Sequence, residues 1–217
     1  MENAHNQPSV YASKPWQQRY DYWVPTEITL PTQPINFALN HSATMFPDQP
    51  ATAFLGVKLT FRELKQHADK LATALSQLGI GKGDRVGVML PNCPQYVISF
   101  FAITRLSAIV ANINPIYTPR EVELVAKDSG MRAIIVLDAL APVVLGVLAH
   151  TNIEQVITTS LLSYSANPTS APDVPEGTLS FSELIVSVAT PKLPRVDIDA
   201  KEDLFSVSSK PDRSTAE

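Results

Sequence analysis

Short apolar runs alternate with amphipathic segments through the middle of this chain, and the connections between them are short. Four of the runs predict buried strands, because they are apolar and are bounded by turn residues; they span 85–90, 108–113, 133–137 and 155–158. A helical pattern at 60–79 precedes these runs, and helical patterns at 94–106, 118–130 and 139–149 separate them. This order predicts βαβ units, and therefore an α/β fold with a mostly parallel sheet and flanking helices.

Capping signals mark several of the expected helices. Thr60 and Glu63 form a capping box, and Gly79 supplies the end of the same helix. Thr118 and Glu121 form a second capping box, with a proline at the first helical position. Further predictions are a helix over 35–46, a strand pair at 51–55 and 57–59 around Gly56, helix caps at Asn92 and Asp138, and a short helix from Ser180 to Val188.

Proline distribution divides the chain. Eighteen prolines stand against eight glycines, and many of the prolines lie in the opening 34 residues and after residue 167. We therefore expect an extended arm at 1–34, a domain at 35–205 and an irregular, disordered tail at 206–217. The arm carries Trp16, Tyr20, Tyr22 and Trp23, which we expect to pack onto a surface of the same chain rather than to stack on a ligand.

Charge and cysteine content exclude several classes of protein. The net charge is −4 with no basic stripe, which argues against nucleic acid as a partner. A single cysteine, Cys93, excludes an intramolecular disulfide and a four-thiolate zinc site, and it fits a reducing, cytoplasmic compartment. The most apolar stretches fall short of the roughly 20 residues that cross a bilayer. We expect no transmembrane segment, while contact with a membrane surface stays open.

The sequence contains no residue pattern typical of a generic catalytic or metal site. The four histidines lack metal-ligand spacing, and Cys93 has no adjacent basic residue. Asp84 and Asp138 lie at turn or cap positions. The glycine-rich segment 79–84 leads from a helix into a strand, whereas a phosphate cradle leads into a helix, so we interpret it as a structural turn. No residue is therefore predicted to be catalytic, cofactor-binding or metal-binding.

Three segments, taken in order, resemble the adenylate-forming acyl-CoA synthetases, the family of AMP-dependent synthetases and ligases. LTFREL at 59–64 is similar to the signature L-T-[YF]-x-E-L, and GKGDRVGVMLPN at 81–92 is similar to K-G-D-R-V-x-[LV]-x-[LM]-P-N. RLSAIVANINPIYTPRE at 105–121 resembles the long-chain fatty-acyl form of G-A-[IV]-V-x-x-x-N-P-x-Y-T-x-x-E. Ser107 stands where the family often has glycine.

The resemblance implies a fatty-acid–CoA ligase. Members join a carboxylate and ATP into an acyl-adenylate, and CoA then captures the acyl group as a thioester, with ATP, Mg²⁺, CoA and fatty acid as ligands. A Ser/Thr/Gly-rich loop with a lysine holds the phosphates, and a mobile C-terminal domain brings the adenylation lysine. These motifs lie downstream of the matched segments. The resemblance thus implies an N-terminal portion that binds no cofactor and has no activity alone.

Similarity stops after Phe205, where the family continues into the phosphate loop. Here the sequence reads SVSSKPDRSTAE, and it has no glycine after Gly177. Our hypothesis is a frameshift, a premature stop or a truncated gene model. The nucleotide sequence beyond the Phe205 codon tests it, because the hypothesis requires a glycine-rich loop in some reading frame.

Two alternatives from other functional classes stay open. The first is an interaction module that docks on a full-length synthetase, or self-associates, through exposed apolar surface. The second is an unrelated doubly wound nucleotide-binding domain, with ligands at the strand ends near Asn92, Asn114 and Asp138. We rank this nucleotide-binding alternative last, since the chain has no G-x-G-x-x-G motif.

Overall fold

A computed structural model describes residues 10–27, 33–166, 174–194 and 206–208. The chain divides into two compact units, Met1–Thr32 and Gln33–Glu217. The described part of the first unit contains a helical turn, α1 (Val10–Ser13), and a 3-10 helix, η1 (Pro15–Arg19). Among its described side chains none is buried. The expected packing of the arm aromatics onto the rest of the chain stays a prediction, as does the division into arm, domain and tail.

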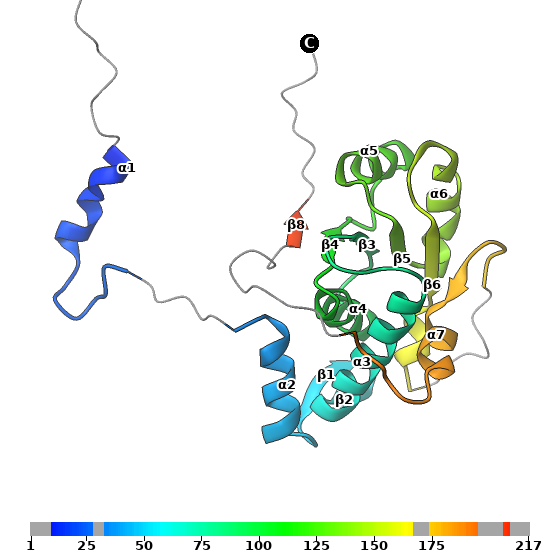
Figure 1. Ribbon diagram of the computed structural model, residues 1–217, viewed down its shortest axis with the longest axis horizontal. Coiled ribbons are helices and arrows are strands. Elements are labelled where there is room, and N and C mark those ends of the chain that lie inside the picture. The colour runs from blue at the N-terminus through cyan, green and yellow to red at the C-terminus, as the bar shows by residue number, and fades with distance from the viewer. Residues whose placement is uncertain (1–9, 28–32, 167–173, 195–205, 209–217) are drawn as a thin grey trace, which may run out of the picture. The chain divides into compact units, whose positions relative to one another are not determined.

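The second unit is built on a parallel sheet (Figure 1), which confirms the predicted α/β class. Its described strands run in the order β7-β6-β5-β3-β4-β8, and every pair of neighbours is parallel. The four predicted strands are the central ones, listed in chain order: β3 (Arg85–Met89), β4 (Ile109–Asn112), β5 (Ala133–Leu137) and β6 (Gln155–Thr159).

Two edge strands extend the sheet beyond the prediction. Strand β7 (Leu179–Ser180) pairs with β6, and strand β8 (Ser206–Ser208) pairs with β4. The first three residues of the expected irregular tail are therefore a strand, and residues 209–217 lie outside the described part of the chain. A separate antiparallel hairpin, β1 (Pro50–Phe54) and β2 (Val57–Thr60), turns at Leu55 and Gly56 as predicted.

Helices cover both faces of the sheet. In β5, Ala133 and Ile135 face one core, while Ile134 and Val136 face the other. The first core also receives the apolar sides of α2 (Asn36–Met45), α3 (Phe61–Gln77), α4 (Pro94–Arg105) and α7 (Phe181–Ser187). The second core receives α5 (Pro119–Ser129) and α6 (Ala141–Leu145). Because successive side chains of a pleated strand point to opposite faces, each central strand contributes residues to both cores.

The predicted caps hold at three helices. Both capping boxes are present, at Thr60 with Glu63 and at Thr118 with Glu121. Gly79 adopts φ +84° directly after Leu78, the C-cap of α3, and the Ile80 amide donates to the Leu75 carbonyl at 3.0 Å, which closes the helix end. Ser180 accepts a hydrogen bond from the Glu183 amide at the start of α7.

Two other cap predictions were wrong. Cys93, not Asn92, is the N-cap of α4, because Pro94 occupies the first helical position. The helix expected over 139–149 is divided into η2 (Asp138–Leu140), α6 and η3 (Leu148–His150). Pro142 lacks an amide hydrogen and its ring clashes with the carbonyl four residues earlier, so a helix tolerates it only in its first turn, which is its place in α6. The Asp138 side chain accepts from the adjacent Ala139 amide at 2.8 Å, and this contact does not cap a helix.

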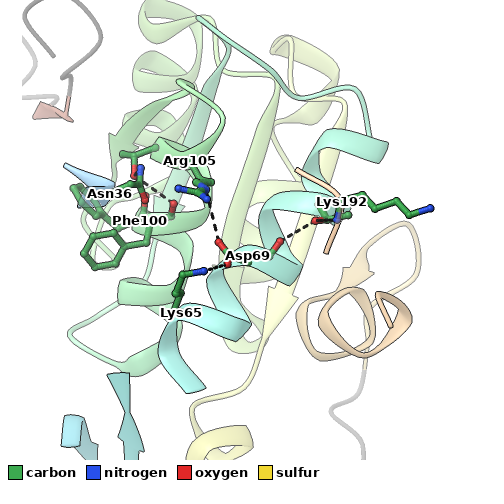
Figure 2. Close-up of polar contacts among 9 residues, drawn as sticks. Asn36, Lys65, Asp69, Phe100, Arg105 and Lys192 are labelled. Carbon is green, nitrogen blue, oxygen red and sulfur yellow. Dashed lines mark hydrogen bonds and ion pairs between the residues drawn. The ribbon is translucent and has the colours of Figure 1, made fainter. Parts of the chain in front are cut away.

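Polar contacts tie the helices of the first core together (Figure 2). Asp69 on α3 forms ion pairs with Lys65 on its own helix and with Arg105 at the end of α4. The Asp69 carbonyl accepts from the Thr73 hydroxyl, and that hydroxyl accepts from the Lys192 amide at 3.2 Å. Helix α3 therefore anchors the segment near Lys192. Within the described ranges, every helix is too short or too polar to cross a membrane.

Candidate ligand-binding recesses at the carboxyl edge of the sheet

Three asparagines lie where two neighbouring strands end. Asn92 follows β3, Asn112 is the last residue of β4, and Asn114 lies two residues further on. The two strands are parallel, with Val88 opposite Asn112. Their carboxyl ends therefore meet at one edge of the sheet, which is the edge where open α/β sheets bind ligands.

These residues line an open, polar recess of about 390 Å³. The hydroxyl of Tyr96, in the first turn of α4, donates to Oδ1 of Asn112 at 2.9 Å. Oδ1 of Asn114 accepts from the Ile116 amide at 3.2 Å. The described lining is uncharged and consists of Val88, Leu90, Asn92, Tyr96, Asn112, Ile113, Asn114 and Tyr117. Amides and phenols without a cation suit a neutral polar ligand group better than a phosphate.

An apolar recess of about 410 Å³ adjoins the polar one and shares Asn92 and Tyr96 with it. It lies between the β1 strand and the start of α4, and the rest of its described lining is Thr52, Ala53, Phe54, Cys93, Pro94 and Val97. Burial raises the pKa of the Cys93 thiol, so the thiol is neutral and serves as an apolar wall. The Thr52 hydroxyl is buried and has no hydrogen-bond partner among the described residues.

The glycine-rich segment 79–84 lies at the opposite, amino edge of the sheet. Asp84 Oδ2 accepts from the Gly81 amide at 2.8 Å and pairs with Arg132, which precedes β5. Arg132 also binds Glu154, which precedes β6, at 2.8 Å. The hydrogen bond from Arg132 lowers the pKa of the Glu154 carboxyl. This network joins the starts of three strands, and its geometry is that of a structural turn.

The histidines are scattered. His67 on α3 lies 3.1 Å from the Tyr164 hydroxyl, His41 stacks on Phe37, and His150 ends η3. His5 lies outside the described residues. In the ranges that the structure describes, no three potential ligands among His, Cys, Asp and Glu gather to hold a metal ion.

Two of the predicted strand ends, Asn92 and Asn114, line the polar recess, whereas its tyrosines were not predicted as site residues. Asn92 had been predicted as a helix cap, and both Asn92 and Asn114 as strand ends of an unrelated nucleotide-binding domain. Asp138, the third strand end, does not line either recess. Tyr96 lies in the helix predicted over 94–106, whose pattern is apolar on most sides, yet it is half-buried and reaches Asn112. A polar residue in the first turn of a helix that follows a buried strand was the available signal.

Solved structures define the class of protein to which this fold belongs. An anthranilate CoA ligase in complex with anthranoyl-AMP matches with a TM-score of 0.70 and 25% identity, over 82% of this chain and 32% of that one. A long-chain-fatty-acid–CoA ligase from Archaeoglobus fulgidus matches with a TM-score of 0.66 and 25% identity, over 82% of this chain and 34% of that one. The fold is that of the N-terminal subdomain of adenylate-forming ligases.

The family follows from the sequence comparison. The model of the AMP-binding enzyme family matches residues 39–205, and the chain belongs to this family. The long-chain-fatty-acid–CoA ligase of Bacillus subtilis is 40% identical over 159 residues, which cover 73% of this chain and 28% of that protein. The Salmonella typhimurium ligase of the same name is 41% identical over 150 residues, 68% of this chain and 27% of that protein. The chain thus spans a little over a quarter of these relatives.

Proposed function

We propose that this chain supplies the N-terminal part of a fatty-acid–CoA ligase, which activates a fatty acid with ATP and Mg²⁺ and transfers the acyl group to CoA. The identity of about 40% with ligases that carry this name, over more than two thirds of the chain, supports the proposal most directly. The parallel sheet then acts as a rigid support that holds Asn92, Asn112 and Tyr96 at its carboxyl edge.

The polar recess restricts which part of a substrate these residues contact. A triphosphate requires cations or a ring of backbone amides, and the described lining offers only amides, phenols and apolar groups. We therefore assign the recess to an uncharged, hydrogen-bonding portion of a substrate. Elements outside the recess hold the phosphates.

A chimera tests both the proposed ligase role of the chain and the assignment of the polar recess to a substrate. Residues 39–205 replace the corresponding part of the Bacillus subtilis ligase, and acyl-CoA formation is measured with ATP, fatty acid and CoA. We expect an active enzyme, whereas a folded but inactive chimera contradicts the assignment.

Within the chimera, Asn92→Leu should raise the KM of one substrate about tenfold, because a hydrogen-bonding group of that substrate is left unpaired. Asn152→Leu, an exposed asparagine before β6 at the opposite edge, is the matched control. Unchanged KM values for all three substrates would show that the polar recess does not contact a substrate.

We further propose that the 217-residue polypeptide has no ligase activity by itself. Chain after Gly177 contains no glycine, and a phosphate loop of backbone amides in tight turns depends on glycine. The test is pyrophosphate release by the purified polypeptide with ATP, Mg²⁺, fatty acid and CoA. Acyl-CoA formation above a protein-free blank would overturn this part of the proposal.

Exposed apolar side chains on the second unit favour a second function, that of an interaction module. Phe37, Met45 and Phe46, on and just after α2, are each about half exposed. Such a surface suits docking on a full-length synthetase or self-association. Co-purification with a full-length synthetase, lost in a Phe37→Ser/Met45→Ser variant, supports this function. A monomer that captures no synthetase argues against it.

A further inference from the structure

The two recesses at the carboxyl edge of the sheet adjoin each other, because Asn92 and Tyr96 line both of them. The apolar recess has a volume of about 410 Å³, which is within the range of small-molecule pockets. Phe54, Pro94 and Val97 give it an apolar wall, and neither recess has a charged residue in its described lining. The pair of recesses therefore suits an amphipathic ligand, with a hydrocarbon part in the apolar recess and a polar head at the junction.

The Tyr96 hydroxyl decides which kind of head group fits. A phenol has one hydrogen to donate, and Tyr96 donates it to Oδ1 of Asn112 at 2.9 Å. Toward any other group the Tyr96 oxygen offers only its lone pairs, so a ligand must supply a hydrogen to bond with it. Hydroxyls and carboxamides have such a hydrogen, whereas an ionised carboxylate has only acceptor atoms. A carboxylate at this position would face the lone pairs of Tyr96.

The uncharged lining favours the same choice of head group. Asn92 is exposed at the junction, and a carboxamide side chain both donates and accepts hydrogen bonds. A carboxylate that leaves water needs a charged partner or several donors, and the described lining contains no lysine, arginine or histidine. A neutral head that donates to Tyr96 and accepts from Asn92 satisfies both side chains.

We propose that the adjoining recesses bind an uncharged single-chain amphiphile, with its hydrocarbon chain against Phe54 and Val97 and a hydroxyl or carboxamide head between Asn92 and Tyr96. This site goes beyond the proposed ligase function, since the fatty acid of that reaction carries a carboxylate at neutral pH. Selectivity against the carboxylate is the property that distinguishes the site from a general apolar surface.

Three probes with the same hydrocarbon chain test the head group directly. Octanamide donates and accepts hydrogen bonds, methyl octanoate only accepts them, and octanoate is charged. The full chain, isotope-labelled in its alanine and valine methyl groups, is titrated with each probe, and affinities are taken from saturable NMR shift changes. We expect the methyl groups of Ala53 and Val97 to shift, and those of Val122 and Ala126 in the second core to stay unchanged.

The expected order of affinity follows from the hydrogen bonds. Octanamide should bind at least about tenfold more tightly than octanoate, and methyl octanoate should fall between them, because it leaves the Tyr96 oxygen unpaired but brings no charge. Cys93 is the only cysteine of the chain and lines the apolar recess, so octanamide should also slow its reaction with methyl methanethiosulfonate. Neither ATP nor CoA takes part, so the outcome is independent of the proposed function.

Three variants assign the contacts. Ala53→Trp adds a large ring to the lining of the apolar recess from an exposed position, and it should weaken octanamide binding at least about tenfold. Ala149→Trp, at an exposed position of η3 that lines neither recess, is the matched control and should leave binding unchanged. Tyr96→Phe removes the acceptor oxygen, so it should reduce the preference for octanamide over methyl octanoate. Circular dichroism checks that the variants keep the fold.

Four results would overturn the inference. Shift changes that do not saturate, or that extend equally to the second core, show partition without a site. Equal affinities for octanamide and octanoate show that the head group does not contact Tyr96. Unchanged binding in Ala53→Trp places the chain outside the apolar recess, and methyl groups that no probe shifts exclude the site.

Discussion

The hydroxyl of Tyr96 donates a 2.9 Å hydrogen bond to Oδ1 of Asn112, and this bond joins the first turn of α4 to the carboxyl end of β4. Both residues line the polar recess. The bond therefore sets the spacing between the helix and the strand at the edge where we place substrate contact. It connects residues that are 16 positions apart and lie on different elements.

Removing this hydroxyl should weaken the fold slightly. Tyr96→Phe deletes one neutral hydrogen bond and leaves the Asn112 carbonyl beside an open recess, where water can replace the donor. We expect the free energy of unfolding to fall by about 1 kcal/mol, measured by urea denaturation. Tyr22→Phe, at a residue of the first unit that is 96% exposed, is the control and should leave the free energy of unfolding unchanged. A loss as large as that of a core deletion would show that the bond has a larger role.

Ser107 is held in an unfavourable backbone conformation. It has φ +52°, it is buried, and its hydroxyl has no hydrogen-bond partner among the described residues. Ser107→Gly removes both the left-handed strain and the unpaired hydroxyl, so it should stabilise the chain by about 1–2 kcal/mol. The family resemblance points to the same residue, since glycine is frequent at this position.

Thermal and urea unfolding of two variants separate the causes at Ser107. Ser107→Ala removes only the hydroxyl and keeps the strained backbone, so it should stabilise less than Ser107→Gly. A Ser107→Gly variant that unfolds more easily than the parent chain would contradict this account.

Gly87 allows close packing between β3 and the start of β5. A Cβ atom at this position would lie 2.7 Å from Sδ of Met131 and 3.0 Å from Cγ1 of Ile134. Gly87→Ala should therefore destabilise the fold by about 1–3 kcal/mol through overpacking.

A double-mutant cycle on urea unfolding checks the cause at Gly87. Met131→Ala alone leaves a cavity, but it also makes room for the new methyl group. The double variant should be more stable than the sum of the two single losses predicts. Strict additivity would mean that Met131 is not the obstacle.

Local chemistry explains which elements could be predicted. The central strands are continuous apolar runs, and the caps at Thr60, Thr118 and Gly79 depend on residues three to five positions apart, so their signals lie within one window of sequence. Strands β7 and β8 are two and three residues long and pair only at the sheet edges. Their pairing is set by the rest of the sheet, and no apolar run marks them.

The candidate site was harder to predict, because it depends on neighbours that are distant in sequence. Thr52, Tyr96 and Asn112 come from three elements, and only the packing of the hairpin on α4 and of α4 on β4 brings them to adjoining recesses. The helix pattern of 94–106 is apolar on most sides, which concealed the exposed side of Tyr96. Pro142 was visible in the sequence, and its effect on the helix after β5 follows from its missing amide hydrogen.

The contact between His67 and Tyr164 predicts a pH dependence of stability. Burial lowers the pKa of His67 below its ordinary value of 6.5, so between the folded and unfolded pKa values the unfolded chain binds more protons. The free energy of unfolding should therefore rise with pH through this interval and level off above about 6.5. Below it, protonation replaces a neutral ring near the Tyr164 hydroxyl, 3.1 Å away, with a partly buried cation. Urea denaturation of the parent and of His67→Gln across pH 5 to 8 measures the difference. The variant should lose the rise between mildly acidic and neutral pH, and an equal rise in both proteins would assign it to other groups.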